Sequence, residues 1–282
     1  MDSKKLVKIR KDKWTSNSLN TFNSIVLASF QKINIEIFSS SSNLLMRKYH
    51  NVIKQDLLNN YRGKLLDIGS GNGGDIHKWK HFRKIVCVEP DEEKIKNLKE
   101  RVSKSDIKNR ISIVQNTIQE VQLDETFDVA SCFFALNDFT YSNIDKMLNN
   151  IKNKIKGTFI ILFFDDALVT SNIEGSIIYK RCVDNATNTF NEIIQKSSNT
   201  YLLSLLRYAH LKCENIIYIH IPESNLTNHY ECGLNSSKII EIFNKYGFSV
   251  INNYSYKQFH FLNSSQTLYS SFLKIIEFCN NK

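Results

Sequence analysis

Four of the nine glycines in this 282-residue chain follow an aspartate within the stretch LLDIGSGNGGDIHKWK, residues 65–80. Gly69, Gly71 and Gly74 have G-x-G-x-x-G spacing, directly after a short apolar run that predicts a buried strand. Glycines at this spacing let the chain turn tightly and let a ligand touch the backbone. The residues therefore predict a small-molecule site at this turn.

The acidic residues near the turn indicate which class of ligand it binds. Dinucleotide sites direct a helix N-terminus at a pyrophosphate, but Asp67 and Asp75 flank these glycines and would repel that anion. Two carboxylates suit a ligand with an ammonium or a sulfonium charge. Glu89, at the end of the next apolar run, can accept hydrogen bonds from both hydroxyls of a ribose. S-adenosylmethionine has all these groups and no phosphate, so the pattern favours a methyltransferase over a dinucleotide enzyme.

The elements that position these residues alternate between strand and helix. Short apolar runs predict strands at 64–68, 84–88, 111–115, 127–132, 157–164, 248–254 and 268–278. Helical spacing predicts helices within 16–60, broken at Ser39–Ser42, and at 74–82, 91–102, 143–155 and 236–246. This alternation predicts an α/β fold with a mostly parallel sheet and helices on both faces. Together with the cofactor pattern at the turn, it leads us to expect the Rossmann-like class I S-adenosylmethionine-dependent methyltransferase fold, with seven strands in the sheet.

The chain divides into two predicted parts. Residues 1–60 are expected to form a basic arm and N-terminal helices, and residues 61–282 the methyltransferase domain. The regular alternation fails at about 165–235, which predicts an insertion with some strand after the fifth strand of the sheet.

The composition indicates which partner and which cellular location to expect. Hydrophobic residues make up 42% of the chain, but no uncharged apolar run is long enough to span a bilayer, and no secretory signal follows the N-terminus. The six cysteines include no CxxC pair, so we expect reduced thiols, no structural zinc and an intracellular protein. A net charge of +9 favours a polyanionic partner. Heavy use of Asn, Lys and Ile suggests an AT-rich genome such as that of a large DNA virus, which would make the location cytoplasmic, and otherwise nuclear.

The sequence also resembles a known family, the mRNA cap guanine-N7 methyltransferases. LDIGSGNGGDIHKWK is similar to that family's LDLGCGKGGD followed by a basic and aromatic helix. Three further segments resemble it: YHNVIKQDLL at 49–58, FDVASCFFAL at 127–136 and HYECGLNSSKIIEIFNKYGF at 229–248. The resemblance covers residues 45–165 well and the C-terminal third loosely.

This resemblance implies a pocket for S-adenosylmethionine. Lys54 would pair with the cofactor carboxylate, Asp67 would lie near its ammonium group, and Glu89 would hold the ribose. Pro90 would pack on the adenine, and Asn116 stands where the family has an aspartate that contacts the adenine amino group. The implied cofactor set is Lys54, Asp67, Gly69, Ser70, Gly71, Asp75, Glu89, Pro90, Asn116, Thr117 and Phe133.

The resemblance further implies a pocket for the GpppN end of capped RNA. Glu231 would recognise the guanine edge, Phe134 would border both ligands, and Arg101 would lie near the cap phosphates. The implied cap set is Asn51, Asn72, Arg101, Phe134, Asn137, Asp138, Tyr230, Glu231 and Tyr269. Asn137-Asp138 replaces the family's His-Tyr and Asn72 replaces a lysine, so the cofactor pocket matches the family better than the cap pocket does.

Methylation of guanine N7 needs no general base, because N7 has a lone pair and no proton. We therefore expect catalysis by positioning, through Glu231 and Phe134, without a metal or an acid–base residue. Two alternatives stay open: a methyltransferase that acts on another RNA, a protein or a small molecule, and a non-catalytic stimulatory subunit of the same fold. The expected partners are capped RNA and other capping-enzyme domains or a stimulatory subunit, because no Lys-x-Asp-Gly nucleotidyl site is found; no membrane partner is expected.

Overall fold

The computed structural model describes residues 40–168, 215–219, 229–255 and 270–281, and for 40–44, 215–219 and 229–232 it describes the backbone alone. The predicted basic arm, the helical pattern before residue 40 and most of the predicted insertion lie outside the described residues. Among the described helices, none combines the length and the apolar character needed to cross a membrane.

Seven strands form one sheet in the order β3-β2-β1-β4-β5-β9-β8. Their bounds are β1 Gly63–Ile68, β2 Phe82–Val88, β3 Ile111–Val114, β4 Phe127–Phe133, β5 Ile155–Phe164, β8 Phe248–Ser255 and β9 Leu273–Asn280. Strands β1 to β5 pair in parallel, whereas β9 runs antiparallel to both β5 and β8. The predicted seven-stranded, mostly parallel sheet is confirmed. The strand order reverses between β1 and β4, which is where open α/β sheets bind ligands at their carboxyl ends.

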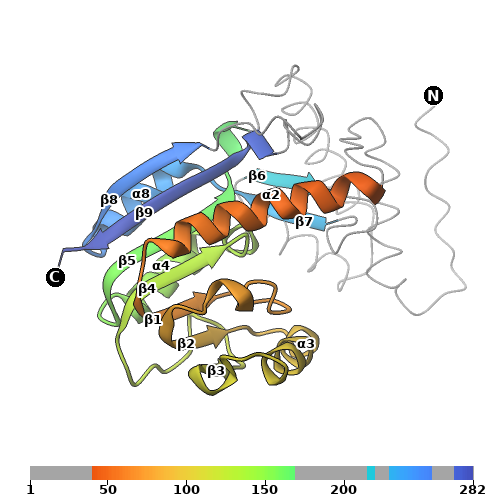
Figure 1. Ribbon diagram of the computed structural model, residues 1–282. Helices are drawn as coiled ribbons and strands as arrows, with labels where there is room; N and C mark the ends of the chain where they lie inside the picture. The colour runs from red at the N-terminus through yellow and green to blue at the C-terminus, as the bar shows by residue number, and fades with distance from the viewer. Residues whose placement is uncertain (1–39, 169–214, 220–228, 256–269, 282) are drawn as a thin grey trace, which may run out of the picture.

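Two apolar layers cover the sheet. Neighbouring residues of a strand face opposite layers, so Leu65 packs with one and Leu66 with the other. The first layer holds α2 and α3, and the second holds α4 and α8; Figure 1 shows α2 crossing in front of the sheet, with α4 and α8 behind it. The helices are α2 Ser40–Asn59, α3 Glu92–Ser103, α4 Tyr141–Ile151 and α8 Ser236–Lys245.

A small second sheet occupies the described part of the predicted insertion. It consists of β6, Asn215–Ile219, and β7, His229–Gly233, paired antiparallel. Leu234, directly after β7, forms a parallel bridge with Asp165, directly after β5. The small sheet therefore lies at the carboxyl ends of the parallel strands (Figure 1).

One predicted feature of the first 82 residues is wrong, and another is wrong in part. The predicted helix at 74–82 is only a 3-10 helix, η2, over Ile76–Lys78. Gly74, at its predicted start, is a poor helix former, and the stretch mixes buried Lys78, Trp79 and Phe82 with exposed His77 and Lys80. Residues 40–42 of the predicted serine break are helical, because α2 begins at Ser40; Ser39 and the helix predicted before it lie outside the described residues. Two other 3-10 helices are η3, Lys108–Arg110, and η4, Leu136–Asp138.

Candidate functional site

The glycine turn begins where β1 ends. Gly69, Gly71 and Gly73 have φ values of 70°, 54° and 75°, which side chains disfavour. A side chain at Gly69 would collide with Ala135 beyond β4, whereas a Cβ on Gly71 would meet no atom within 4 Å. Gly69 therefore closes the packing between two strand ends, and Gly71 leaves its backbone open to a ligand.

Glu89 joins this turn to the end of β2. Its Oε2 accepts a hydrogen bond from the Gly71 backbone N–H at 2.8 Å, and its Oε1 accepts one from the Asp91 N–H at 3.2 Å. The side chain is 3% exposed. Each carboxylate oxygen has a second lone pair, so Glu89 can accept ribose hydroxyls while it holds the turn.

Asp67 is a buried carboxylate that no lysine contacts directly among the described residues. Its Oδ1 accepts a hydrogen bond from Ser131 Oγ at 2.6 Å. Burial, with the charge of Asp75 adding to it, raises the pKa of Asp67 to about 6. A buried carboxylate without a cation is suited to receive the ammonium group of a ligand.

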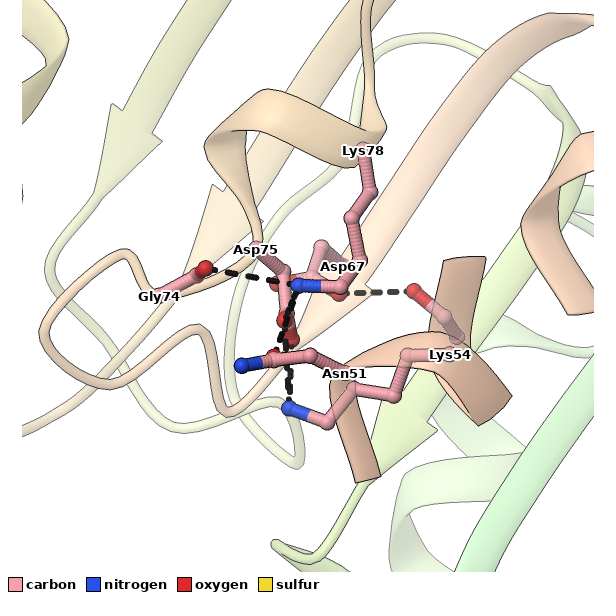
Figure 2. Close-up of polar contacts among 7 residues, drawn as sticks. Asn51, Lys54, Asp67, Gly74, Asp75 and Lys78 are labelled. Carbon is pink, nitrogen blue, oxygen red and sulfur yellow. Dashed lines mark hydrogen bonds and ion pairs between the residues drawn. The ribbon is translucent and has the colours of Figure 1, made fainter. Parts of the chain in front are cut away.

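Asp75, in contrast, already has two cations (Figure 2). Lys54 Nζ lies 2.9 and 3.1 Å from its two oxygens, and Lys78 Nζ lies 2.7 Å from Oδ1. Burial alone would raise the pKa of Asp75, but the two ammonium charges outweigh it and hold the pKa below its ordinary value. The expectation that Asp75 faces a positive charge of the cofactor is therefore corrected, because its charge is balanced within the protein.

Lys78 is the residue that the sequence reasoning missed. Its Nζ also donates to Asn51 Oδ1 at 2.9 Å, so Asn51, predicted to contact the cap, links α2 to the glycine turn. The only sequence signal was the Asp75–Lys78 spacing, which permits an ion pair in one helical turn.

Phe134 lies directly beyond β4 and has a φ of 61°, the one positive value outside glycine in the described chain. A bulky residue in this conformation is strained, and such strain collects at functional sites. Its ring centroid lies 5.3 Å from Lys54 Nζ, 5.1 Å from the His50 ring and 5.7 Å from the Phe164 ring. Phe134 is thus placed beside Lys54, as a residue bordering two ligands would be.

The other residues of the predicted cofactor set differ in their exposure and in their hydrogen bonds. Pro90 is exposed, whereas Phe133 is 7% exposed and packs in the α2 layer of the core. Asn116 Oδ1 accepts a hydrogen bond from the Thr117 N–H at 2.7 Å. Thr117 Oγ1 is buried and has no hydrogen-bond partner among the described residues, so it is free to serve a ligand. Ser70 Oγ donates to the Asp67 carbonyl at 3.1 Å and shapes the turn.

The predicted cap residues separate into structural and surface positions. Asn137 is fully buried, and its side chain donates to Phe164 O at 3.0 Å and accepts from Phe164 N at 2.9 Å. This position therefore joins η4 to β5 and is corrected from a cap contact to a structural link. Asp138 and Arg101 are exposed, and Asn72 Oδ1 accepts a hydrogen bond from Asn97 on α3 at 3.0 Å.

The remaining predicted cap residues belong to β7 and beyond. Tyr230 and Glu231 lie in β7, where their backbones pair with Tyr218 and Ile217 of β6. Strand β7 contacts η4, and the Asp166 N–H donates to Leu234 O at 2.9 Å. The backbone of Glu231 thus runs close to the end of β5. Tyr269 lies outside the described residues.

Comparison with known proteins fits this geometry. Residues 65–157, which include the glycine turn and Glu89, match the family model described as a methyltransferase domain. The chain carries a methyltransferase domain. Its fold is the class I S-adenosylmethionine-dependent methyltransferase fold, and S-adenosylmethionine, the predicted cofactor, is the cofactor of that fold class.

Several solved structures share the fold of this domain. A Listeria monocytogenes protein assigned to the S-adenosylmethionine-dependent methyltransferases is 14% identical, with a TM-score of 0.55, over 84% of this chain and 99% of that one. Magnesium protoporphyrin IX methyltransferase from Synechocystis PCC 6803, with bound S-adenosylhomocysteine, is 11% identical, with a TM-score of 0.52, over 93% and 97%. An N-methyltransferase from Bradyrhizobium japonicum, also with S-adenosylhomocysteine, is 12% identical, with a TM-score of 0.51, over 84% and 87%.

One curated relative is similar in sequence over a shorter region. It is an uncharacterized killer plasmid protein from Kluyveromyces lactis, 36% identical over 92 residues, or 32% of this chain. The match spans only 14% of that protein's length.

The residues at the turn fit the cofactor of the fold class. The open backbone at Gly71 gives room for the ligand, and the buried Asp67 carboxylate suits its ammonium group. Glu89 provides acceptors for the ribose, and Thr117 Oγ1 has no hydrogen-bond partner among the described residues. The turn therefore has carboxylates that suit the ammonium group and the ribose hydroxyls of S-adenosylmethionine.

Proposed function

We propose that this methyltransferase domain transfers the methyl group of S-adenosylmethionine to N7 of the guanine cap of RNA. The observation that carries the proposal is the position of the Glu231 strand. Strand β7 contacts η4, and Leu234 pairs with Asp165, so the segment with the proposed guanine-recognition residue runs beside the strand end that bears Phe134. The resemblance to cap methyltransferases gives Glu231 and Phe134 their proposed roles.

The chemistry asks little of the protein beyond positioning. S-adenosylmethionine supplies a methyl group that its sulfonium already activates, and guanine N7 has no proton to remove. Holding the reactants in line can lower the barrier by roughly 7–11 kcal/mol. Burial and the nearby Lys54 charge lower the pKa of His50 to about 3, so this ring next to Phe134 is neutral and is not a proton donor. A carboxylate at Glu231 would stabilise the positive charge that the guanine ring acquires on methylation.

A methyl-transfer assay on capped and uncapped transcripts tests the proposal. The protein is incubated with labelled S-adenosylmethionine and either GpppA-ended RNA or the same RNA with a 5′ triphosphate. Nuclease digestion and mass spectrometry then locate the methyl group. We expect 7-methylguanosine from capped RNA alone. A methyl group on a ribose 2′ oxygen, on an internal base or on the uncapped RNA would overturn the cap assignment and leave the methyltransferase domain acting on another substrate.

Glu231→Ala sharpens the test, with Glu241→Ala as the matched control because Glu241 is exposed on α8. Losing a charged hydrogen-bond acceptor for guanine is expected to lower kcat/KM for capped RNA about a hundredfold. The Kd for S-adenosylhomocysteine should stay near the wild-type value, since Glu231 is assigned to the substrate. A Glu231→Ala enzyme as active as the Glu241→Ala enzyme would contradict the guanine role.

A further inference from the structure

Lys78 is a fully buried lysine beside the proposed cofactor site. Its side chain is 0% exposed, and its Nζ lies 2.7 Å from Asp75 Oδ1, 2.9 Å from Asn51 Oδ1 and 3.5 Å from Gly74 O. Three acceptors match the three donors of an ammonium group. Burying such a charge is costly unless it is paired, so its partners explain how the fold tolerates it but not what it contributes.

The two lysines on Asp75 differ in their freedom. Lys54 comes from α2, is 15% exposed and contacts the Phe134 ring, whereas Lys78 comes from η2 and is enclosed. Two ammonium groups on one carboxylate leave one positive charge unbalanced within this cluster. Of the two, Lys54 is the one that reaches solvent, and it can turn toward an anion without leaving Asp75 unpaired.

We infer that Lys78 is a positioning residue for the amino-acid end of S-adenosylmethionine: it neutralises Asp75 from the buried side, so that Lys54 can pair with the cofactor carboxylate. This inference rests on the proposed use of S-adenosylmethionine. Without Lys78, Asp75 and the cofactor carboxylate would compete for Lys54, and one of them would be left without a cation. A ligand that lacks the amino-acid end would not enter this competition.

Two ligands with the same nucleoside separate this role from a general structural one. S-adenosylhomocysteine has the amino-acid end, and 5′-methylthioadenosine does not. Isothermal titration of Lys78→Met is expected to show a Kd for S-adenosylhomocysteine raised by about tenfold or more over wild type, because one buried charge loses its partner. Binding of 5′-methylthioadenosine should change by no more than about twofold. Lys80→Met is the matched control, since Lys80 pairs with Asp106 at an exposed site, and it should leave both affinities unchanged.

A double-mutant cycle tests whether Lys78 acts through Lys54. In the Lys54→Met background, adding Lys78→Met should weaken S-adenosylhomocysteine binding by less than about twofold. Lys54, the cation for which Asp75 and the ligand carboxylate compete, is already absent there. Additive losses, or an equal loss for both ligands in Lys78→Met, would overturn the positioning role.

A second variant covers the case in which Lys78→Met is too unstable to titrate. Asp75→Asn with Lys78→Met removes the buried carboxylate and its cation together, so no unpaired charge is left in the core. Its thermal midpoint should exceed that of Lys78→Met, and its S-adenosylhomocysteine affinity should lie within about threefold of wild type because Lys54 is released. An affinity at least tenfold below wild type in this folded variant would contradict the inference. Wild-type protein that binds neither ligand would instead overturn the proposed function.

Discussion

The two halves of the sheet's carboxyl edge are built in different ways. The cofactor half, at the ends of β1 and β2, consists of open backbone and buried charges, among them Gly71, Asp67 and Glu89. The half proposed to bind the substrate, called here the substrate half, lies at the ends of β4 and β5. It contains the rings of Phe134 and Phe164 and the backbone bridge between Asp165 and Leu234. The first half suits a zwitterionic nucleoside, and the second has the partly exposed ring of Phe134, an aromatic face of the kind on which a base stacks.

The halves also differ in how the chain assembles them. Most polar groups of the cofactor half come from one stretch, from Lys54 to Glu89, and one motif contains many of them; Thr117 and Ser131 join from beyond it. The substrate half brings together residues 134–138, 165–166 and 231–234, which only the tertiary fold makes neighbours. The residues of a half that depends on one motif can be recognised in the sequence. In a half assembled from distant segments, the residues of one segment can be substituted while the others stay the same. The departures from the cap family at 137–138 lie in this second half, although Asn72 departs within the motif.

Glu89→Ala gives the largest expected effect and tests the cofactor half. The change removes the acceptor for ribose hydroxyls and leaves the Gly71 and Asp91 N–H groups without their partner. Losing hydrogen bonds to a charged group should weaken S-adenosylhomocysteine binding by about ten- to hundredfold in isothermal titration. Glu92→Ala, at an exposed position in the first turn of α3, is the control and should bind normally. Equal affinities for the two variants would refute the division into halves.

Asp67→Asn gives an intermediate effect and separates function from stability. Because the pKa of Asp67 is raised to about 6 in the folded protein, the wild type loses stability as the pH rises from about 4 to about 6, and the loss persists above that range. At pH 7 the asparagine variant should be more stable by up to about 3 kcal/mol in urea unfolding, and near pH 4 the two proteins should be similar.

The same variant should bind the cofactor more weakly. Without the carboxylate, S-adenosylhomocysteine affinity at pH 7 is expected to fall about tenfold, because a charged hydrogen bond to the ammonium group is lost. Wild-type affinity should decline as the pH falls below about 6 and Asp67 takes up a proton, whereas the variant should show no such decline. A pH profile shared by both proteins would show that another group titrates.

Phe134 gives the smallest effect and probes strain in the substrate half. Both Phe134→Ala and Phe134→Gly lose the ring contacts, but only glycine relieves the positive φ of 61°. The glycine variant should therefore be about 1 kcal/mol more stable than the alanine variant in urea unfolding. The adjacent Ala135 has a φ of −91°, so Ala135→Gly should be destabilising instead. An alanine variant as stable as the glycine variant would mean that the backbone relaxes once the ring is gone.

Much of the fold could be predicted from local pattern. The continuous apolar runs at β1, β2, β4 and β5 are typical of strands buried on both faces, and each was located to within two or three residues. Helices α3, α4 and α8 also followed their apolar spacing. The last strand was placed early, at 268–278 instead of Leu273–Asn280, because its apolar run continues from residues 270–272, which form a helical turn.

The parts that could not be predicted depend on tertiary contacts. Lys78 looks like a surface residue because lysine is almost never fully buried, and only the folded chain brings Asn51 and Asp75 to it. Asn137 was predicted to be a ligand contact because it stands where the cap family has a histidine, yet both of its polar atoms bind the backbone of Phe164. Asp67 and Asp75 look alike in sequence, and the number of cations around each one makes their acidities opposite.

The place of β9 has a consequence for how the protein is synthesised. This strand, Leu273–Asn280, lies between β5 and β8 although it comes after both along the chain. Until the ribosome has released residue 280, β5 presents an unpaired edge and β8 has no neighbour in the sheet. Nascent chains that stall late are thus expected to expose the unpaired, apolar edge of β5. Such chains should bind chaperones or aggregate.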